Sequence, residues 1–214
     1  MRGTGRGTAP RVRRKISAPA WQSWHVRPSV EAVAQAVSDL VPGDEDEADD
    51  IAVTLGWLQR TDDVFRRVKP DVPDRHLVSY VVPVDPDSGR VLLGEHLNAG
   101  LWLPPGGHVE PDEHPAVTAG REAGEELGID AAGRLDADPM FLSSARTVGV
   151  DSGHTDVSLW FPLALGRHDR LEVERREFRS VRWWSPDEVR AVPPGWFDPA
   201  FGRFTAKLAT RSFE

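Results

Sequence analysis

The feature that most constrains the fold is one helix-forming segment, residues 115–127, that stands among segments with the alternation of β-strands. Strands around a single helix, with more helices near both chain ends, are typical of a mixed α/β sandwich. Pro162 has no backbone N–H, so we expect its strand to lie at a sheet edge or to contain a bulge. The predicted strands are 76–84, 90–95, 140–150, 156–165 and 178–184, with a turn at 85–89 and a loop with a short strand at 101–110.

Composition divides the chain into three regions. Residues 1–20 have no apolar periodicity and carry six positive charges in the first fifteen positions, which predicts a disordered basic tail. An RNA- or phosphate-binding arm and a misplaced start codon are the alternatives. Residues 21–73 predict a helical extension that packs on the main domain or forms a dimer surface. Residues 74–214 form the main domain.

The extension is expected to contain two or three helices. The first follows Ser29 as N-cap and ends at Pro42-Gly43. Six of the seven residues in 44–50 are acidic, which favours a solvated loop and helix start, where acids suit the helix dipole, over a cation or partner site. Apolar residues in 51–68 predict one or two further helices, with a restart at Thr61. At the other end of the chain, helices are expected after Ser185-Pro186-Asp187-Glu188 and near 199–211.

Composition also excludes several function classes. The chain has no cysteine, which excludes thiolate zinc sites, cysteine nucleophiles and disulfides. No apolar run approaches the roughly 20 residues of a membrane span, and no secretory signal is evident, so we expect a soluble cytoplasmic protein. The net charge is −8, and the six positive charges of the tail leave −14 for the remainder. This acidity argues against nucleic-acid binding, and an anionic substrate would need a metal ion to bridge it to an acidic site.

The sequence of the predicted helix at 115–127 gives it a low intrinsic helix stability. Glu122, Glu125 and Glu126 are spaced i, i+3 and i+4, so their carboxylates share one face and repel each other. Glycines at 120, 124 and 128 each cost about 1 kcal/mol against alanine if they lie inside a helix. Local rules tend to fail at functional sites. A hard cation would remove the repulsion, and all-oxygen carboxylate sites suit Mg²⁺ or Mn²⁺, whereas a solvated acidic face is the alternative.

The segment around this helix resembles the Nudix box without a gap. A 23-residue window satisfies all nine specified positions of that motif, with Ala123 as a small residue at the aliphatic position. The matching residues are Gly107, Glu113, Arg121, Glu122, Ala123, Glu125, Glu126, Gly128 and Ile129. The resemblance implies a Nudix-type α/β/α sandwich with a mixed sheet over roughly residues 74–211, and a metal-dependent hydrolase. The first seventy residues lie outside it.

The resemblance also assigns roles to individual residues. It implies that Glu122, Glu125 and Glu126, with the backbone carbonyl of Gly106, hold Mg²⁺ or Mn²⁺. Arg121 would pair with Glu113 and orient the glutamates, and Gly107 would allow a close turn of the backbone. The general base would be Glu125 or Glu126 or, as in family members that use a later loop, Glu177; an exposed loop acid is the alternative for Glu177.

The sequence defines less well which residues would contact the phosphates and the nucleobase of a substrate. His108 is a candidate phosphate contact beside the box, although the seven histidines show no ligand spacing. Trp102, Tyr80 or Phe141 could stack a nucleobase, but aromatic residues in a sheet more often belong to the core. One of Trp183 and Trp184 is expected in the core, because neighbours on a strand face opposite sides. Further candidates are residues 153–156, for which a turn is the alternative, and Arg146, Arg175 and Arg179.

Together these features predict a pyrophosphohydrolase that acts on a small nucleoside-diphosphate-type molecule, namely a nucleoside di- or triphosphate or a nucleotide-sugar. A homodimer is the candidate assembly. One rival is an isoprenoid diphosphate isomerase, which commonly needs the cysteine that this chain lacks. The other rival is a non-catalytic Nudix-like regulatory module, in which the box is often degraded, whereas this box is intact.

Overall fold

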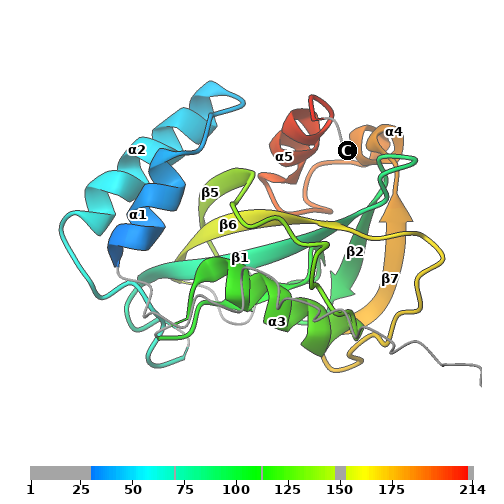
Figure 1. Cartoon of the computed structure of the whole chain (residues 1–214), viewed down its shortest axis with the longest axis horizontal. Helices are drawn as coiled ribbons and strands as arrows, with labels where there is room; N and C mark the ends of the chain where they lie inside the picture. The colour runs from blue at the N-terminus through cyan, green and yellow to red at the C-terminus, as the bar shows by residue number, and fades with distance from the viewer. Residues whose placement is uncertain (1–29, 70, 112, 148–152, 212–214) are drawn as a thin grey trace, which may run out of the picture.

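The computed structural model of the protein describes residues 30–69, 71–111, 113–147 and 153–211 (Figure 1). Its centre is a seven-stranded sheet with the order β3-β2-β1-β6-β5, in which β4 pairs with β1 and β7 pairs with β2. β1 and β6 run parallel and the other pairs are antiparallel, so the predicted mixed sheet is confirmed. The strands are β1 Arg75–Val84, β2 Val91–His96, β3 Trp102–Leu103, β4 Gly106–His108, β5 Phe141–Arg146, β6 Thr155–Ala164 and β7 Phe178–Trp184.

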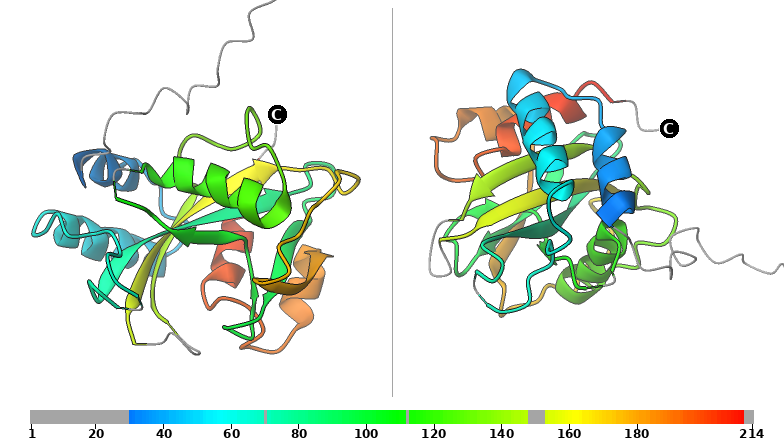
Figure 2. Two further views of the ribbon diagram at one scale, coloured as in Figure 1. Left: turned by 90° about the horizontal axis from the view of Figure 1, so that it is seen from below. Right: turned by 90° about the vertical axis from the view of Figure 1, so that its left-hand side faces the viewer.

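Helices cover both faces of the sheet. α3 (Pro115–Leu127) lies on one face, and α4 (Pro186–Ala191) and α5 (Phe201–Leu208) lie on the other (Figures 1 and 2). Side chains of β1 alternate between these faces. Leu77 and Val81 belong to the core that includes the α3 alanines, whereas Val82 and Val84 belong to the core under α5. Trp183 and Trp184 divide between the same two cores, with Trp184 fully buried.

Pro162 does not mark an edge strand or a bulge, contrary to the sequence-based expectation. β6 lies between β1 and β5, and Pro162 is paired in register with Val82 of β1. The last β5 partner of β6 is Phe141, opposite Trp160, so β5 has ended before Pro162 is reached. The Pro162 carbonyl accepts from Asp136 N on that side. Since N and O of one strand residue point the same way, the missing donor faces the segment around Leu135, which forms only an isolated bridge with β6 and no strand.

The described part of the N-terminal extension contains two helices, α1 (Val30–Ser38) and α2 (Glu45–Leu58), which pack on the main domain beside β5 (Figure 1). Val33, Val37 and Leu58 are buried in the same core as Leu142 of β5. The predicted helix restart at Thr61 is wrong. The Thr61 hydroxyl instead accepts from the backbone at residue 63, and the chain continues irregularly toward β1.

The acidic segment before α2 begins the helix as predicted, with Asp44 as its N-cap. It is not fully solvated, however, because Glu47 is completely buried. The Glu47 carboxylate pairs with Lys207 Nζ of α5 at 2.7 Å and accepts from Gly43 N at 2.7 Å and Leu142 N at 3.2 Å. Arg203 of α5 contacts three further acids of the segment, at positions 44, 46 and 50. These ion pairs join the extension to the last helix.

Some expectations lie outside the described residues, namely the basic tail, the Ser29 cap and the end of the predicted strand at 148–150. In the described part of the chain, no helix has the length and apolar character required to cross a membrane.

Candidate functional site

α3 begins and ends at the predicted residues because both ends have local capping signals. Pro115 occupies the first turn, and the His114 side chain accepts from Ala116 N at 3.2 Å. Gly128 ends the helix with φ 68°, the left-handed conformation that glycine adopts without a steric penalty. The helix therefore places its three glutamates at fixed positions relative to the sheet.

Two of the three glutamates are buried. Glu122 is 8% exposed and Glu126 is 6% exposed, whereas the Glu125 side chain is 59% exposed. Burial raises the pKa of Glu122, and the neighbouring Arg121 opposes that rise. Burial, followed by repulsion from Glu122, raises the pKa of Glu126 to about 8. Two carboxyl groups thus lie where negative charge is costly unless a cation compensates it.

The glycine pair of β4 fits closely against these carboxylates. Gly106 N donates to Glu126 Oε2 at 2.9 Å. A Cβ added at Gly107 would lie 2.1 Å from Glu122 Oε1, which no side chain tolerates without displacing that carboxylate. A side chain at position 107 would therefore move the Glu122 carboxylate out of its present position.

Arg121 joins the acids of the box in one ion-pair network. Its guanidinium donates to both carboxylate oxygens of Glu113, at 3.1 and 3.2 Å, in the pairing expected from the sequence. A third guanidinium nitrogen reaches Glu122 Oε1 at 2.8 Å and Glu125 Oε2 at 3.1 Å. Thr118 Oγ1 also donates to Glu113 at 2.8 Å. Bidentate arginine–carboxylate pairs have a fixed planar geometry, so this network holds the orientation of α3 side chains.

Glu177 lies just before β7, next to the same site. Its side chain is 45% exposed and its carboxylate is 3.6 Å from His96 Nε2. Its negative charge contributes to the raised pKa of Glu126, which requires the two carboxylates to be near each other. Glu177 is therefore a partly exposed acid at the edge of the glutamate site.

The structure brings three histidines together although their sequence spacing gives no sign of a cluster. His76 starts β1, His108 ends β4 and His154 precedes β6, and each has Nε2 within 4 Å of Asp156 Oδ1. The strand register explains the cluster, since His76 is paired with Asp156 and residue 108 is paired with Val78. A weak signal was available: His76 and His154-x-Asp156 place polar residues at the starts of otherwise apolar strands.

The aromatic candidates lie on the α5 side of the sheet. Phe141 is fully buried, so the core interpretation is confirmed for it. Tyr80 and Trp102 are partly buried, and their rings meet Trp160 and Trp184 edge-on, with centroids 4.7 and 5.2 Å apart. Of the candidate arginines, Arg179 pairs with Glu95 of β2 at 2.7 Å.

Comparison with known proteins decides the family. The family model of the NUDIX domain matches residues 74–208, which is more than half of the chain. The chain belongs to the Nudix hydrolase family. A CTP pyrophosphohydrolase of Escherichia coli (strain K12) is 30% identical over 141 residues, covering 63% of this chain and 96% of that protein. A bis(5'-nucleosyl)-tetraphosphatase (asymmetrical) of Sus scrofa is 41% identical over 89 residues, covering 41% of this chain and 58% of that protein.

Solved structures agree on the fold of this Nudix hydrolase. The MutT protein from Methanosarcina mazei Go1 superimposes with a TM-score of 0.50 at 19% identity, covering 63% of this chain and 92% of that structure. The unmatched part of the Nudix hydrolase includes α1 and α2, since the family match begins just before β1. The named pyrophosphohydrolase relatives support a hydrolase over the isomerase and regulatory alternatives.

Proposed function

We propose that this Nudix hydrolase cleaves a diphosphate linkage in a nucleoside triphosphate or a related nucleotide, with Mg²⁺ or Mn²⁺ bound at Glu122, Glu125 and Glu126. The observation that carries this proposal is the pair of buried carboxylates on α3, packed against the glycine pair of β4. The relatives named as a CTP pyrophosphohydrolase and a dinucleoside tetraphosphatase favour nucleoside polyphosphates over nucleotide-sugars as the first substrates to test.

The residues present fit a hard divalent cation. Glu122 and Glu126 are buried acids whose pKa values are raised, and their repulsion disappears when a cation compensates the charge. Glu125 adds a solvent-facing carboxylate on the same helix face. Oxygen ligands suit Mg²⁺ and Mn²⁺, and the backbone carbonyl of Gly106 is our candidate for an additional ligand.

The chain's own residues then supply position and proton transfer. When bound, the metal neutralises the diphosphate charge and lowers the pKa of a coordinated water. Arg121 and Glu113 act as positioning residues, because their bidentate pair fixes the guanidinium that holds Glu122 and Glu125. The β4 glycines allow the phosphates to approach the backbone closely.

Glu177 is our preferred general base. It is more exposed than Glu122 and Glu126, so it can meet an incoming water, and it is electrostatically coupled to Glu126. A carboxylate that binds the metal ion is partly neutralised by it and is therefore a weaker base, which favours Glu177. Glu125 and Glu126 are the alternative bases, each through a carboxylate oxygen that the ion leaves free. Glu177→Gln should lower kcat by about 10²-fold or more with little change in KM, whereas a merely exposed acid would leave both values unchanged.

The nucleobase would lie on the α5 side of the sheet. Trp102 and Tyr80 are partly buried there, and an edge-on neighbour holds each ring in place. Stacking on an aromatic residue contributes about 1–3 kcal/mol per base, so Trp102→Ala should raise KM for nucleotides more than for inorganic tripolyphosphate. An equal effect on both substrates would refute base stacking at this residue.

The first experiment measures phosphate and nucleotide release from nucleoside triphosphates, dinucleoside polyphosphates and nucleotide-sugars with Mg²⁺ and then Mn²⁺. Glu126→Gln keeps the shape of the side chain and should abolish turnover. Glu110→Gln is the matched control, because Glu110 is an exposed acid at an unspecified position of the box. Turnover that survives in Glu126→Gln, or that needs no metal, would overturn the proposed mechanism. Light scattering of the same samples tests the predicted homodimer.

A further inference from the structure

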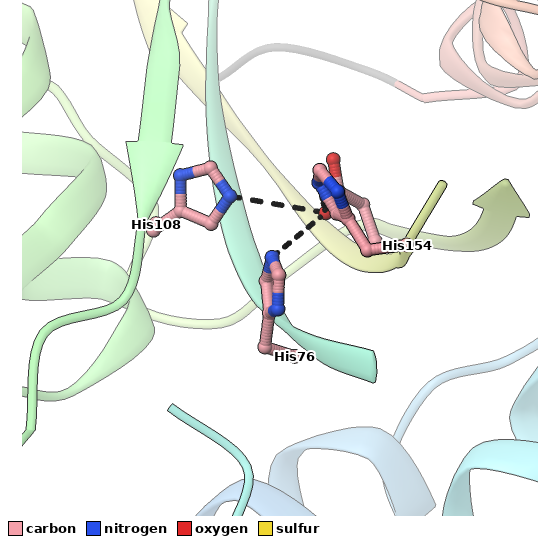
Figure 3. Close-up of side chains that lie close together, drawn as sticks. His76, His108 and His154 are labelled. Atoms are coloured by element: carbon pink, nitrogen blue, oxygen red, sulfur yellow. Dashed lines mark ion pairs between the residues drawn. The ribbon is translucent and has the colours of Figure 1, made fainter. Parts of the chain in front are cut away.

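His76 of β1, His108 of β4, Asp156 of β6 and His154, which directly precedes β6, converge on one point. Their nearest ligand atoms all lie within 4.8 Å of one another. Asp156 Oδ1 is 3.2 Å from His76 Nε2, 3.3 Å from His154 Nε2 and 3.9 Å from His108 Nε2. Figure 3 shows the three imidazoles turned toward each other, with the ion pairs of His76 and His108 ending on the same carboxylate oxygen.

The polar atoms at this point lack hydrogen-bond partners. His76 Nε2, His108 Nε2 and Asp156 Oδ1 are buried, and none of them forms a hydrogen bond of acceptable geometry. His76 is completely buried and His154 is 3% exposed. A single buried polar atom without a partner is already unfavourable. One cation bound between three such atoms would give all of them a partner at once.

Neighbouring groups orient two of the rings so that Nε2 faces the common point as an acceptor. His76 Nδ1 is 2.8 Å from the Pro73 carbonyl, which can only accept, so Nδ1 carries the proton. His154 Nδ1 is 3.3 Å from Thr147 Oγ1, whose own hydroxyl donates to the His154 carbonyl. Nδ1 of His154 therefore donates as well. Metal-ligating histidines are commonly held in this way, with the second nitrogen donating to an outer partner.

We propose that His76, His108, His154 and Asp156 form a second metal site, which takes a transition-metal dication with a preference for imidazole, Zn²⁺ above all. Three imidazoles and one carboxylate match the ligand types of zinc, whereas Mg²⁺ prefers oxygen ligands alone. Ligand atoms of a tetrahedral zinc site lie about 3.3 Å apart at bond lengths of about 2.0–2.1 Å. Two of the three histidine–aspartate distances already have this value, and the widest pair closes with movements of about 1 Å.

This second site is separate from the glutamate site. His76 alternates along β1 with Leu77, which packs in the α3 core, so His76 faces away from α3. Gly107 faces α3, as its approach to Glu122 shows, so the next residue, His108, faces the opposite side. The two sites therefore use neighbouring residues of β4 on opposite faces. An ion at the histidine site would link β1, β4 and β6, and would fix the strand that carries Gly106 and Gly107.

Zinc titration of the full chain tests the proposal. Protein stripped with a chelator and then desalted is titrated with ZnCl₂ in excess Mg²⁺, so that the carboxylate site is occupied by magnesium. We expect one tightly bound Zn²⁺ per chain and a rise in Tm on binding, since an ion that binds only the folded state stabilises it. Replacing zinc with Co²⁺ should give the intense visible absorption of a tetrahedral nitrogen–oxygen site.

Three variants locate the ion. His108→Ala should weaken zinc binding at least tenfold, because the loss of outer partners alone costs about 10–100-fold. His168→Ala, at an exposed histidine outside the cluster, should bind zinc as the wild type does. Glu126→Gln should also bind zinc as the wild type does, whatever its effect on hydrolysis. Zinc binding is therefore tested independently of the proposed hydrolysis, and either proposal can fail without the other.

Two results would overturn the second metal site. The first is obtained with the wild type alone: the folded protein binds no stoichiometric Zn²⁺ and, with cobalt, gives only the weak spectrum of hydrated Co²⁺. The second is equal zinc affinity in His108→Ala and the wild type.

Discussion

Replacing Glu126 with glutamine should change the pH dependence of stability of the metal-free protein, as well as abolish hydrolysis. In the folded state, burial and the neighbouring Glu122 raise the pKa of Glu126 from 4.5 to about 8. The folded protein therefore binds this proton more tightly than the unfolded chain does. Stability of the wild type consequently falls as pH rises from about 4.5 to about 8, and glutamine, which does not titrate, removes that loss.

The size of the effect follows from the two pKa values. Each pKa unit corresponds to about 1.4 kcal/mol. At pH 7 the raised pKa has therefore lowered the free energy of unfolding of the wild type by about 3 kcal/mol, relative to its value below pH 4.5. In the variant, the buried NH₂ group of the glutamine lowers the free energy of unfolding by about 1–3 kcal/mol if it has no hydrogen-bond acceptor. The variant is therefore less stable than the wild type at pH 5. Its stability relative to the wild type rises by up to about 1.4 kcal/mol per pH unit between pH 5 and 7, so the metal-free variant is the more stable of the two at pH 7.

Urea unfolding in a chelating buffer at pH 5, 6 and 7 measures this difference. Glu125→Gln is the matched control on the same helix, since the Glu125 side chain is mostly exposed and the buried Glu126, which causes the loss of stability, stays in place. Saturating Mg²⁺ should stabilise the wild type more than Glu126→Gln and thus reverse the order at pH 7. Parallel curves for Glu126→Gln and the wild type from pH 5 to 7 would refute the assigned burial of Glu126.

Three further predictions concern other contacts. Gly107→Ala should lower kcat at least tenfold with little change in Tm, because the new Cβ displaces the flexible Glu122 carboxylate; unchanged turnover would contradict this. Lys207→Met should destabilise the protein by about 3 kcal/mol in urea unfolding by leaving Glu47 buried without a counter-charge, and adding Glu47→Gln should recover part of the loss. Hydrogen bonds at the α4 N-cap hold the pKa of Glu188 at about 2, so Glu188→Gln should destabilise above pH 4.5, and the difference should shrink as pH falls toward 2.

Local signals in the sequence were sufficient for much of the fold. α3 has the predicted bounds because a proline starts it and Gly128 ends it in a left-handed conformation. α4 begins at the predicted Ser185-Pro186, where Ser185 and Glu188 form a capping box. β7 also has the predicted bounds, since its residues alternate between the two cores. For the two helices the determining contacts lie within a few residues of each other, and for β7 the alternation of side chains can be read along the chain itself.

The features that sequence reasoning missed depend on contacts between distant residues. The central position of β6 requires its pairing with β1, about eighty residues earlier in the chain. The burial of Glu47 depends on Lys207, 160 residues away. The histidine cluster requires the parallel register of β1 with β6 and the pairing of β4 with β1. Chain spacing carries no information about such pairings, so the three histidines looked scattered.

The buried Glu47–Lys207 pair shows that the packed unit is larger than the region of sequence similarity. The family match starts at residue 74, yet α1 and α2 cover a core surface that includes Leu142 of β5. A fragment that begins at residue 74 would expose this apolar surface to water and leave Lys207 without its acid. The smallest part of the chain that folds on its own should therefore extend back to α1, and the homologous region alone is expected to aggregate when expressed.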